Sequence, residues 1–486
     1  MTIDILPDDI LLLIFLFDRA TSIDGLNGIN PKLLSWRWDR LVHVCRRWRV
    51  VVFASPNSLD LKIVCGPWTH VELTGVWPPL PIVIWSSVYW PLGKDYDFET
   101  AIVHYNRVCE VTLLCLSSLQ LQRYASAMQE KFPALMHLKL SLASGYTDSA
   151  PALPDGFPGG YTPRLQSLEL HSIPFPALPK LLLSATDLVR LFISNIPHFG
   201  YLSFSPEVIV TVLAALVNLK YFSIEFKYPQ SRSGWERRHT RKSTRIVLPA
   251  LTDFVFYGLS EYLEDVLADI DVPLLESILI TFFHQPIFDI PQLAQLMGRT
   301  TRFQTPNEAH VYFNNFDLLV GYHVPLTRTI GKMSGLTISS REMNQQSSLE
   351  HVFTSFFPSV FKVEHLYIYE PGNPYLQWHY DYEGMHWPRI FDPFTAVKNL
   401  YLSKEFITHI APVLYKLSEE GGTDVLPALQ NIYLGIRPSE DSEPIQEFIA
   451  EFVAARQLAS RPITVSFWER DPDRTWAQEP EIDCYW

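Results

Sequence analysis

The sequence has little charge, few cysteines and no long apolar run, and each shortage argues against a class of protein. Charged residues make up 19% of the 486 residues and hydrophobic residues 47%, which is typical of a folded chain. The longest early apolar run, residues 10–17, is much shorter than the ~20 residues that cross a bilayer. There is no basic secretory leader and no Asn-x-Ser/Thr sequon. We therefore expect no membrane association and a cytoplasmic or nuclear location, or both.

The five cysteines do not form a recognisable framework for disulfides or zinc. Their number is odd, no Cys-x-x-Cys pair occurs, and no histidines are spaced around them as zinc ligands would be. We expect reduced thiols and no metal at these positions: Cys45, Cys65, Cys109, Cys115 and Cys484. Cys109 and Cys115 lie in an apolar segment, so burial is the simplest interpretation of both.

Positive charge and catalytic motifs are also scarce. The formal net charge is −13, and a general nucleic-acid binder needs a basic face to neutralise phosphates. No Gly-x-Ser-x-Gly, phosphate-binding Gly-rich loop or His-Glu-x-x-His motif is found. We therefore expect no nucleic-acid partner, no cofactor and no catalytic activity.

The N-terminal segment predicts a helix that is apolar on every side. Pro7 is suited to the first turn, and Asp8 and Asp9 lie at the positive end of the helix dipole. All eight residues of 10–17 are apolar, whereas a surface helix normally has one apolar stripe. A small domain covers only part of such a helix, so the remainder predicts a partner.

A second helical pattern follows in residues 36–52. Apolar side chains recur there on one predicted face, at Leu41, Val44, Cys45, Trp48 and Val52. The sequence Ser-Pro-Asn-Ser at 55–58 ends this segment.

Together these segments resemble the F-box family, and the chain is similar to an expanded group of fungal F-box proteins. The residues that carry the resemblance are Leu6, Pro7, Asp8, Asp9, Ile10, Ile14, Phe15, Val44, Cys45, Arg46, Trp48, Ser55, Pro56 and Leu59. The family has only a short turn between its helices, so residues 19–36 are predicted to be an inserted loop.

The resemblance implies three short helices that bind a Skp-type adaptor, and through it a cullin and a RING subunit. The adaptor contacts it implies are Leu6, Pro7, Ile10, Ile14, Phe15, Val44, Cys45 and Trp48. The alternative for several of them is that they build the core of the small domain itself.

The rest of the chain repeats the pattern Leu-x-x-Leu-x-Leu, with other apolar residues at some positions. The copies begin at Val108, Leu135, Leu165, Leu188, Leu219, Leu251, Leu275, Val363, Val397 and Leu429. Successive copies lie 23 to 34 residues apart, except for one gap of 88 residues. This length fits leucine-rich repeats, each a short strand and a returning helix. Degraded copies are expected near 310–313 and 336–338, and helices near 178–185, 208–216, 259–269 and 406–417.

We therefore predict an α/β protein: a small helical F-box domain followed by an irregular leucine-rich-repeat-like solenoid. It is irregular because the asparagine or cysteine of well-formed repeats is missing. The predicted segments are 1–65 (F-box-like), 66–100 (linker or N-terminal cap), 101–468 (solenoid) and 469–486 (acidic tail). The tail either caps the last repeat or frays.

Target recognition is expected on strand residues between the repeat leucines and on insertions. One row is predicted to face the same side: Lys139, Glu169, Phe192, Ser223, Val255, Tyr367, Tyr401 and Tyr433. Candidate target contacts are Tyr367, Trp378, Tyr380, Tyr401 and Tyr433, because aromatic residues are enriched in interfaces. The alternative is that these are ordinary exposed strand residues.

Two insertions have distinctive compositions. Residues 230–245 hold six Lys or Arg, which fits a nuclear-localisation signal, a patch for an acidic partner or a solvated surface loop. Residues 370–388 are rich in Tyr, Trp and His, which fits a substrate-contacting loop or packing over the solenoid edge. A metal site at His379, Asp381 and His386 is the weakest interpretation, because nothing fixes their geometry.

These features predict the substrate-recognition subunit of a Skp–cullin–F-box ubiquitin ligase, which binds an unknown protein substrate and performs no chemistry itself. It would raise the effective concentration of target lysines near the charged E2. The first alternative is a non-catalytic binding scaffold whose F-box is vestigial or serves another complex. The second is an enzyme built on a repeat scaffold.

Overall fold

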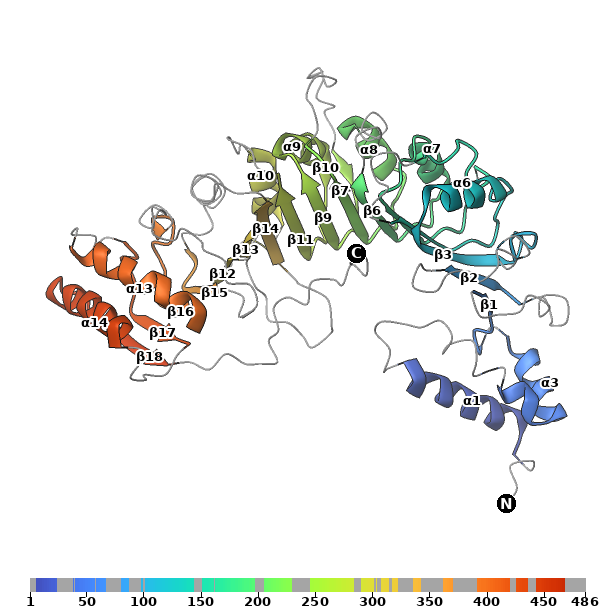
Figure 1. Ribbon diagram of the computed structural model, residues 1–486, viewed down its shortest axis with the longest axis horizontal. Coiled ribbons are helices and arrows are strands. Elements are labelled where there is room, and N and C mark those ends of the chain that lie inside the picture. Colours follow the sequence, from blue (N-terminus) through green and yellow to red (C-terminus); the bar gives the residue numbers. More distant parts are fainter. Residues whose placement is uncertain are drawn as a thin grey trace. The chain divides into compact units, whose positions relative to one another are not determined.

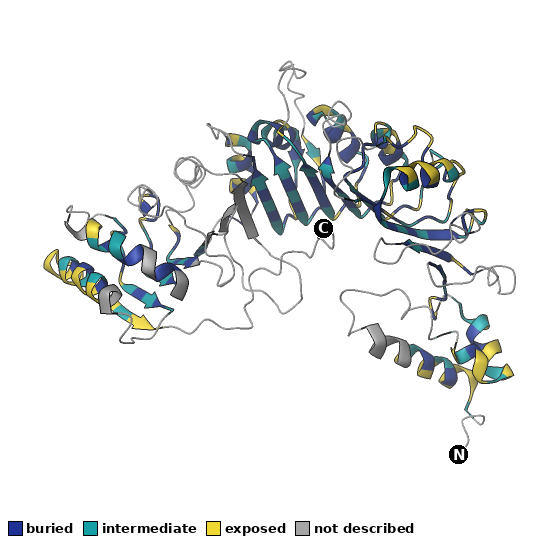
Figure 2. Ribbon diagram, viewed as in Figure 1, coloured by how far each residue is buried: buried dark blue, intermediate teal, exposed yellow. Residues whose placement is uncertain are grey.

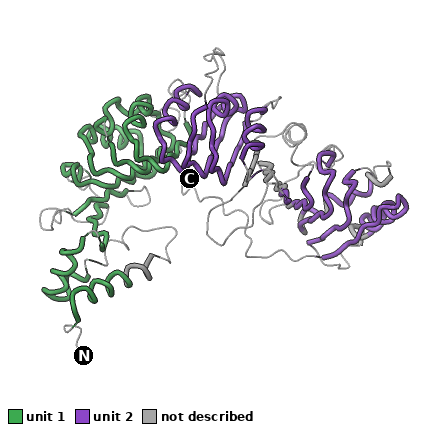
Figure 3. The backbone as a smooth tube through the Cα atoms, turned by 180° about the vertical axis from the view of Figure 1, so that it is seen from behind, with its two compact units in different colours: residues 1–203, 486 green, residues 204–485 purple. Residues whose placement is uncertain are grey.

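Figure 1 shows the computed structural model of the chain. The described residues are 6–23, 38, 40–56, 58–66, 80–86, 98, 101–143, 151–160, 162–196, 205–229, 245–283, 290–300, 303, 307–313, 317–321, 335–341, 362–369, 391–419, 425–435 and 443–467. The chain divides into two compact units, residues 1–203 and 204–485 (Figure 3). The division falls inside the predicted solenoid.

The N-terminal part of unit 1 contains α1 (Asp8–Ile23) and α3 (Arg46–Ala54), and residues 40–44 are helical as well. Helix α1 begins directly after Pro7, with Asp8 and Asp9 in its first turn. It continues to Ile23, because no glycine or proline interrupts the chain before Gly25. The prediction of a loop from residue 19 is therefore wrong at its first boundary, and residues 24–37 lie outside the described residues.

Six strands of unit 1 each pair in parallel with the next strand along the chain. They are β1 (Ile63–Cys65), β2 (Ile82–Ser86), β3 (Val108–Leu116), β4 (His137–Leu142), β5 (Ser167–His171) and β6 (Arg190–Ile196). Helix α6 (Ser118–Ala127) follows β3, and α7 (Leu178–Ser184) follows β5. The sheet thus starts at Ile63, earlier than the predicted solenoid boundary at residue 101. Cys109 and Cys115 lie buried in β3, as expected.

Unit 2 begins with three strands of the same kind, β7 (Tyr221–Phe226), β9 (Asp253–Gly258) and β11 (Ser277–Phe282), paired in parallel. Helix α8 (Pro206–Leu213) precedes β7, α9 (Ser260–Asp269) follows β9, and α10 (Pro291–Arg299) follows β11; α9 packs against both α8 and α10. A separate parallel pair joins β8 (Ile246–Val247) to β10 (Ile270–Asp271).

The long gap in the repeat pattern has a different topology from the one predicted. Strands β12 (Glu308–Phe313) and β14 (Gly335–Arg341) lie at the two expected positions, but β13 (Asp317–Gly321) runs antiparallel between them. β14 pairs with β11, and β12 pairs with the following repeat strand. The spatial order is therefore reversed relative to the chain, and these strands are not consecutive repeats.

The remaining strands of unit 2 return to the parallel order. They are β15 (His365–Tyr369), β16 (Asn399–Leu402), β17 (Asn431–Leu434) and β18 (Thr464–Phe467). Helix α13 (Lys404–Glu419) lies between β16 and β17, and α14 (Glu443–Leu458) lies between β17 and β18. Four predicted return helices thus occur where the pattern placed them, as α7, α8, α9 and α13.

The parallel register follows from the repeat itself. Equivalent leucines align across neighbouring strands, as in the row of Leu138, Leu168 and Leu191, and all three are buried. A side-chain period of two sends the alternate residues to the opposite face. Buried residues accordingly follow the strands of each unit (Figure 2). The fold is α/β with parallel sheets. Among the described helices, none is both long and apolar enough to cross a membrane.

Candidate functional site

Helix α1 packs against α3 through one of its apolar stripes. Leu11 and Phe15, one turn apart, are buried, and Phe15 is only 2% exposed. The ring of Phe15 lies 4.8 Å from that of Trp48, at an interplanar angle of 58°. Val51 and Val52 of α3 are buried as well. Phe15 is therefore part of the domain's own core, and hardly any of its surface is left for a partner.

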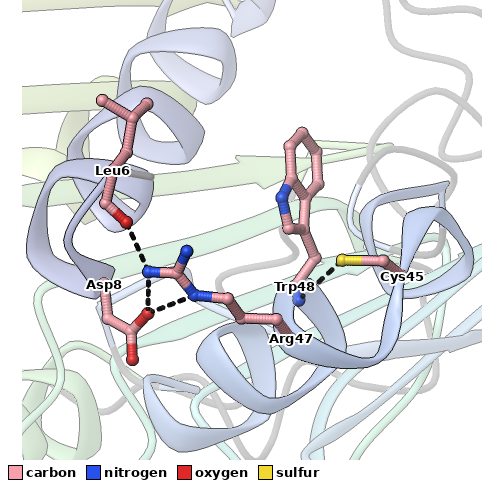
Figure 4. Close-up of polar contacts among 5 residues, drawn as sticks. All are labelled: Leu6, Asp8, Cys45, Arg47 and Trp48. Carbon is pink, nitrogen blue, oxygen red and sulfur yellow. Dashed lines mark hydrogen bonds and ion pairs between the residues drawn. The ribbon is translucent and has the colours of Figure 1, made fainter. Parts of the chain in front are cut away.

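A polar contact fixes the start of α1 to α3 (Figure 4). The Arg47 guanidinium donates to Oδ1 of Asp8 through Nη2 at 2.7 Å and through Nε at 2.9 Å. Nη2 also donates to the backbone carbonyl of Leu6. These bonds hold Leu6 and Pro7 at the base of α1, because they tie both sides of Pro7 to one side chain.

Cys45 caps α3, which the sequence pattern did not predict. Its extended backbone interrupts the helical segment, and its Sγ accepts from the Trp48 N–H at 3.4 Å (Figure 4). The 36–52 segment is therefore broken at Cys45, and the single apolar face predicted there is wrong. Val42 and Val52 are buried, whereas Val44 is 58% exposed.

The second apolar stripe of α1 is exposed to solvent. Its four side chains are spaced i, i+3, i+4 and i+7, so they share one face of the helix: Ile10 (38% exposed), Leu13 (59%), Ile14 (40%) and Phe17 (72%). Four neighbouring large apolar side chains on a surface mark an interaction site more often than isolated ones do. We call this set the α1 stripe.

The eight predicted adaptor contacts thus fall into different environments. Pro7, Ile10, Ile14 and Val44 are exposed; Leu6, Cys45 and Trp48 are partly exposed; Phe15 is buried. The sequence interpretation missed Leu13 and Phe17. Their helical spacing from Ile10 places them on the same face as Ile10. The sequence does not reveal this face, because every residue of 10–17 is apolar.

A second candidate surface is a stack of aromatic rings in the C-terminal part of unit 2. His310, Tyr367, Tyr401 and Tyr433 occupy equivalent positions of β12, β15, β16 and β17. Successive ring centroids lie 4.5, 4.2 and 4.5 Å apart, with interplanar angles of 7°, 10° and 8°. We call this row the aromatic ladder. It contains three of the predicted target contacts and His310, which the sequence pattern did not single out.

A polar row runs beside the aromatic ladder. The Asn431 amide donates to Oδ1 of Asn399 at 2.8 Å, and the Asn399 amide lies 3.3 Å from Nδ1 of His365. Thr464 hydrogen-bonds to Asn431. Burial, and secondarily the neighbouring Tyr433, raises the pKa of Tyr401 above its ordinary value. The Tyr401 hydroxyl therefore stays protonated at neutral pH and acts as a neutral hydrogen-bonding group.

The equivalent positions of β4 and β5 in unit 1 are charged, and that of β6 carries Phe192, two residues after Arg190. Glu169 lies between Lys139 (3.1 Å) and Arg190 (2.9 Å), so the three charges form a chain of ion pairs across β4, β5 and β6. Burial, and secondarily Lys139, lowers the pKa of the neighbouring His171. The set of Lys139, Glu169 and Arg190 keeps a net charge of +1, because one carboxylate pairs with two cations.

One predicted target contact is corrected by the structure, and others lie outside the described residues. Ser223 is fully buried and its hydroxyl donates to Oε1 of Glu225 at 3.0 Å, so it is not an exposed contact as predicted. Trp378 and Tyr380 lie outside the described residues, as do residues 230–244, the proposed metal ligands and the acidic tail. Within the described part of the chain, no group of three or more His, Cys, Asp or Glu could hold a metal ion.

Comparison with known proteins assigns no relative. No protein-family model matches the chain, and no curated protein matches its sequence. The candidate sites therefore rest on their own geometry.

Proposed function

We propose that this protein is the substrate-recognition subunit of a Skp–cullin–F-box ubiquitin ligase. In this proposal the α1 stripe binds the Skp-type adaptor, and the repeat-bearing sheets bind the protein substrate. The adaptor recruits the cullin and the RING subunit. The chain itself contributes position and not chemistry.

The α1 stripe is the observation that carries the proposal. A helix with one stripe in the core and a second stripe in water needs a partner to cover the second one. Covering Leu13 and Phe17 alone, which are more than half exposed, stabilises a complex by about 2 to 4 kcal/mol. The occupant is inferred from the F-box resemblance of the surrounding residues, Leu6 to Phe15 and Val44 to Trp48.

The Arg47 contact supports the same interpretation. By fixing the first turn of α1, it presents the stripe on a preformed helix, so binding costs little conformational entropy. The second candidate function is a repeat scaffold whose helical N-terminus serves another complex. The aromatic ladder supports the ligase subunit and the repeat scaffold equally, because each of them requires a protein-binding face.

The test is co-purification of the full chain with the Skp-type adaptor of the same organism. The diagnostic variant is Leu13→Asp/Phe17→Asp, which puts two charges on the stripe without touching the core. The matched control is Leu119→Asp in α6, because Leu119 is also an exposed apolar helix residue, at 79%. We expect a one-to-one complex with the wild type and the control, and no complex with the double variant.

A folded wild-type chain that does not bind the adaptor would overturn the ligase proposal and leave the scaffold. Circular dichroism of all three proteins establishes that they are folded. Phe15 is unsuitable for this test, because its substitution would disturb the core and the stripe together.

A further inference from the structure

The polar row beside the aromatic ladder is a chain of hydrogen bonds that crosses four strands. Its members occupy equivalent positions: Thr464 in β18, Asn431 in β17, Asn399 in β16 and His365 in β15. The Thr464 hydroxyl donates to Oδ1 of Asn431. The Asn431 amide donates to Oδ1 of Asn399 at 2.8 Å, and the Asn399 amide nitrogen lies 3.3 Å from Nδ1 of His365. Every donor in the polar row therefore points toward β15.

This direction decides which nitrogen of His365 carries the hydrogen. An amide N–H only donates, so Nδ1 must accept, and the neutral ring holds its hydrogen on Nε2. The Tyr401 hydroxyl lies 3.5 Å from the same Nδ1 and suits either state, because a hydroxyl can donate or accept. Protonation of His365 places an N–H opposite the Asn399 N–H. Two facing donors leave both without an acceptor, which is unfavourable at a partly buried position.

Reversal of the polar row removes this conflict. A primary amide that turns by half a revolution exchanges its oxygen and its nitrogen with little change of shape. Turning both amides makes His365 donate to Asn399 and Asn399 donate to Asn431. The Asn431 N–H then donates to the Thr464 hydroxyl, whose hydrogen can turn to the Gln430 carbonyl, 3.5 Å away. Both ends of the polar row thus fit either direction.

The charged groups around His365 accommodate an added proton. On one side, the carboxylate of Glu364 is paired with Lys398 at 2.6 Å, so these two charges cancel. On the other side, Glu308 of β12 is aligned with His365, and its carboxylate lies 3.7 Å from Nε2 of His310. Helix α13 contacts β15 on the buried face, opposite His365. Glu308 therefore supplies a carboxylate at the end of the polar row, where a protonated His365 adds positive charge.

We propose that the polar row is a proton-driven switch: uptake of a proton by His365 reverses the hydrogen bonds through Asn399 and Asn431. The reversal exchanges the oxygen and the nitrogen that each amide presents beside the aromatic ladder. A partner that binds these amides in one direction meets mismatched donors and acceptors in the other. This consequence for target binding rests on the proposed function, whereas the reversal is a property of the sheet alone.

The test is NMR spectroscopy of the full chain, isotope-labelled in histidine and asparagine. The protein is titrated from about pH 8 to about pH 5, the range in which histidine side chains usually change charge. At the upper end we expect His365 to carry its hydrogen on Nε2. On acidification, the side-chain amide signals of Asn431 should shift together with the ring signals of His365, although Asn399 lies between them.

Asn399→Leu is the decisive variant, because leucine has nearly the shape of asparagine but cannot relay a hydrogen bond. In this variant the Asn431 signals should no longer follow His365, whereas a direct effect of the His365 charge would persist. The matched control is Asn218, an exposed asparagine after α8, whose side-chain signals should stay constant through the titration.

A hydrogen on Nδ1 of His365 at about pH 8 would overturn the inference, and this measurement needs no variant. So would Asn431 signals that ignore the protonation of His365, or that still follow it in folded Asn399→Leu. Circular dichroism establishes that the variant is folded. The adaptor co-purification does not involve the polar row, so failure of either experiment leaves the other proposal standing.

Discussion

Phe15 and Phe17 are two residues apart on α1, and we expect their alanine variants to fail in opposite ways. Phe15 is 2% exposed and packed on Trp48, so Phe15→Ala leaves a cavity in a small core. Such substitutions cost about 3 to 5 kcal/mol, which is comparable with the whole stability of a domain of this size. Phe17 is 72% exposed, so Phe17→Ala should change the free energy of unfolding by less than about 0.5 kcal/mol.

Adaptor affinity should show the reverse order for the folded proteins. Burying the exposed part of Phe17 in an interface stabilises it by about 1 to 2 kcal/mol, which corresponds to a 5- to 30-fold weaker Kd in Phe17→Ala. Hydrogen exchange of residues 8–54 in the full chain measures the stability of the helical domain. Titration with the purified adaptor measures the affinity.

Two results would refute the reasoning. If Phe17→Ala exchanged its amides as fast as Phe15→Ala, the exposed stripe would be structural and not an interface. If Phe17→Ala bound the adaptor as tightly as the wild type while folded, the partner would cover another face. Leu119→Ala, at a similarly exposed apolar position of α6, controls for general loss of surface hydrophobicity.

Four further predictions concern stability. Burial, and secondarily Glu207, raises the pKa of Tyr262 well above its ordinary value. The Tyr262 hydroxyl is protonated in both the folded and the unfolded protein below about pH 10. Above that pH the unfolded protein loses this proton first, so the free energy of unfolding should fall. Urea unfolding should show a smaller fall for Tyr262→Phe. Gly258→Ala should cost about 1 to 3 kcal/mol, because its Cβ would lie 2.7 Å from a ring carbon of Phe256. Gly298→Ala, in open space on α10, should gain about 0.5 kcal/mol in the same assay. Arg47→Met should cost about 1 kcal/mol in hydrogen exchange of α1, and 1 M NaCl should reduce the difference, since the ion pair is partly exposed.

The repeat strands could be predicted from sequence because their information is local. Each Leu-x-x-Leu-x-Leu copy fixes a strand, its buried face and its alignment with the next copy, as for Tyr367, Tyr401 and Tyr433. The reversal of β12, β13 and β14 could not be predicted, because it depends on pairing between strands far apart in the chain. A pattern that gives strand positions does not give their spatial order.

The helical domain was harder for a different reason. When every residue of a helix is apolar, periodicity cannot tell the core stripe of Leu11 and Phe15 from the exposed stripe of Leu13 and Phe17. Cys45 was equally ambiguous, because the sequence context that predicts a docking residue also fits a side chain that caps α3. The contacts with Trp48 show that Phe15 belongs to the core and that Cys45 caps α3. The periodicity of the sequence does not predict these contacts.

The same repeat position has different chemistry in the two units, and this difference bears on where a target binds. In unit 1 the position carries Lys139 and Glu169, whose charges pair across β4 and β5, and Phe192 in β6. In the C-terminal part of unit 2 it carries three tyrosines, whose rings stack on one another. A row of stacked rings offers a protein partner more aromatic contact area than a pair of opposite charges does. We therefore expect variants that weaken binding of the proposed target to map to the tyrosines of β15 to β17 and not to the charged positions of β4 and β5.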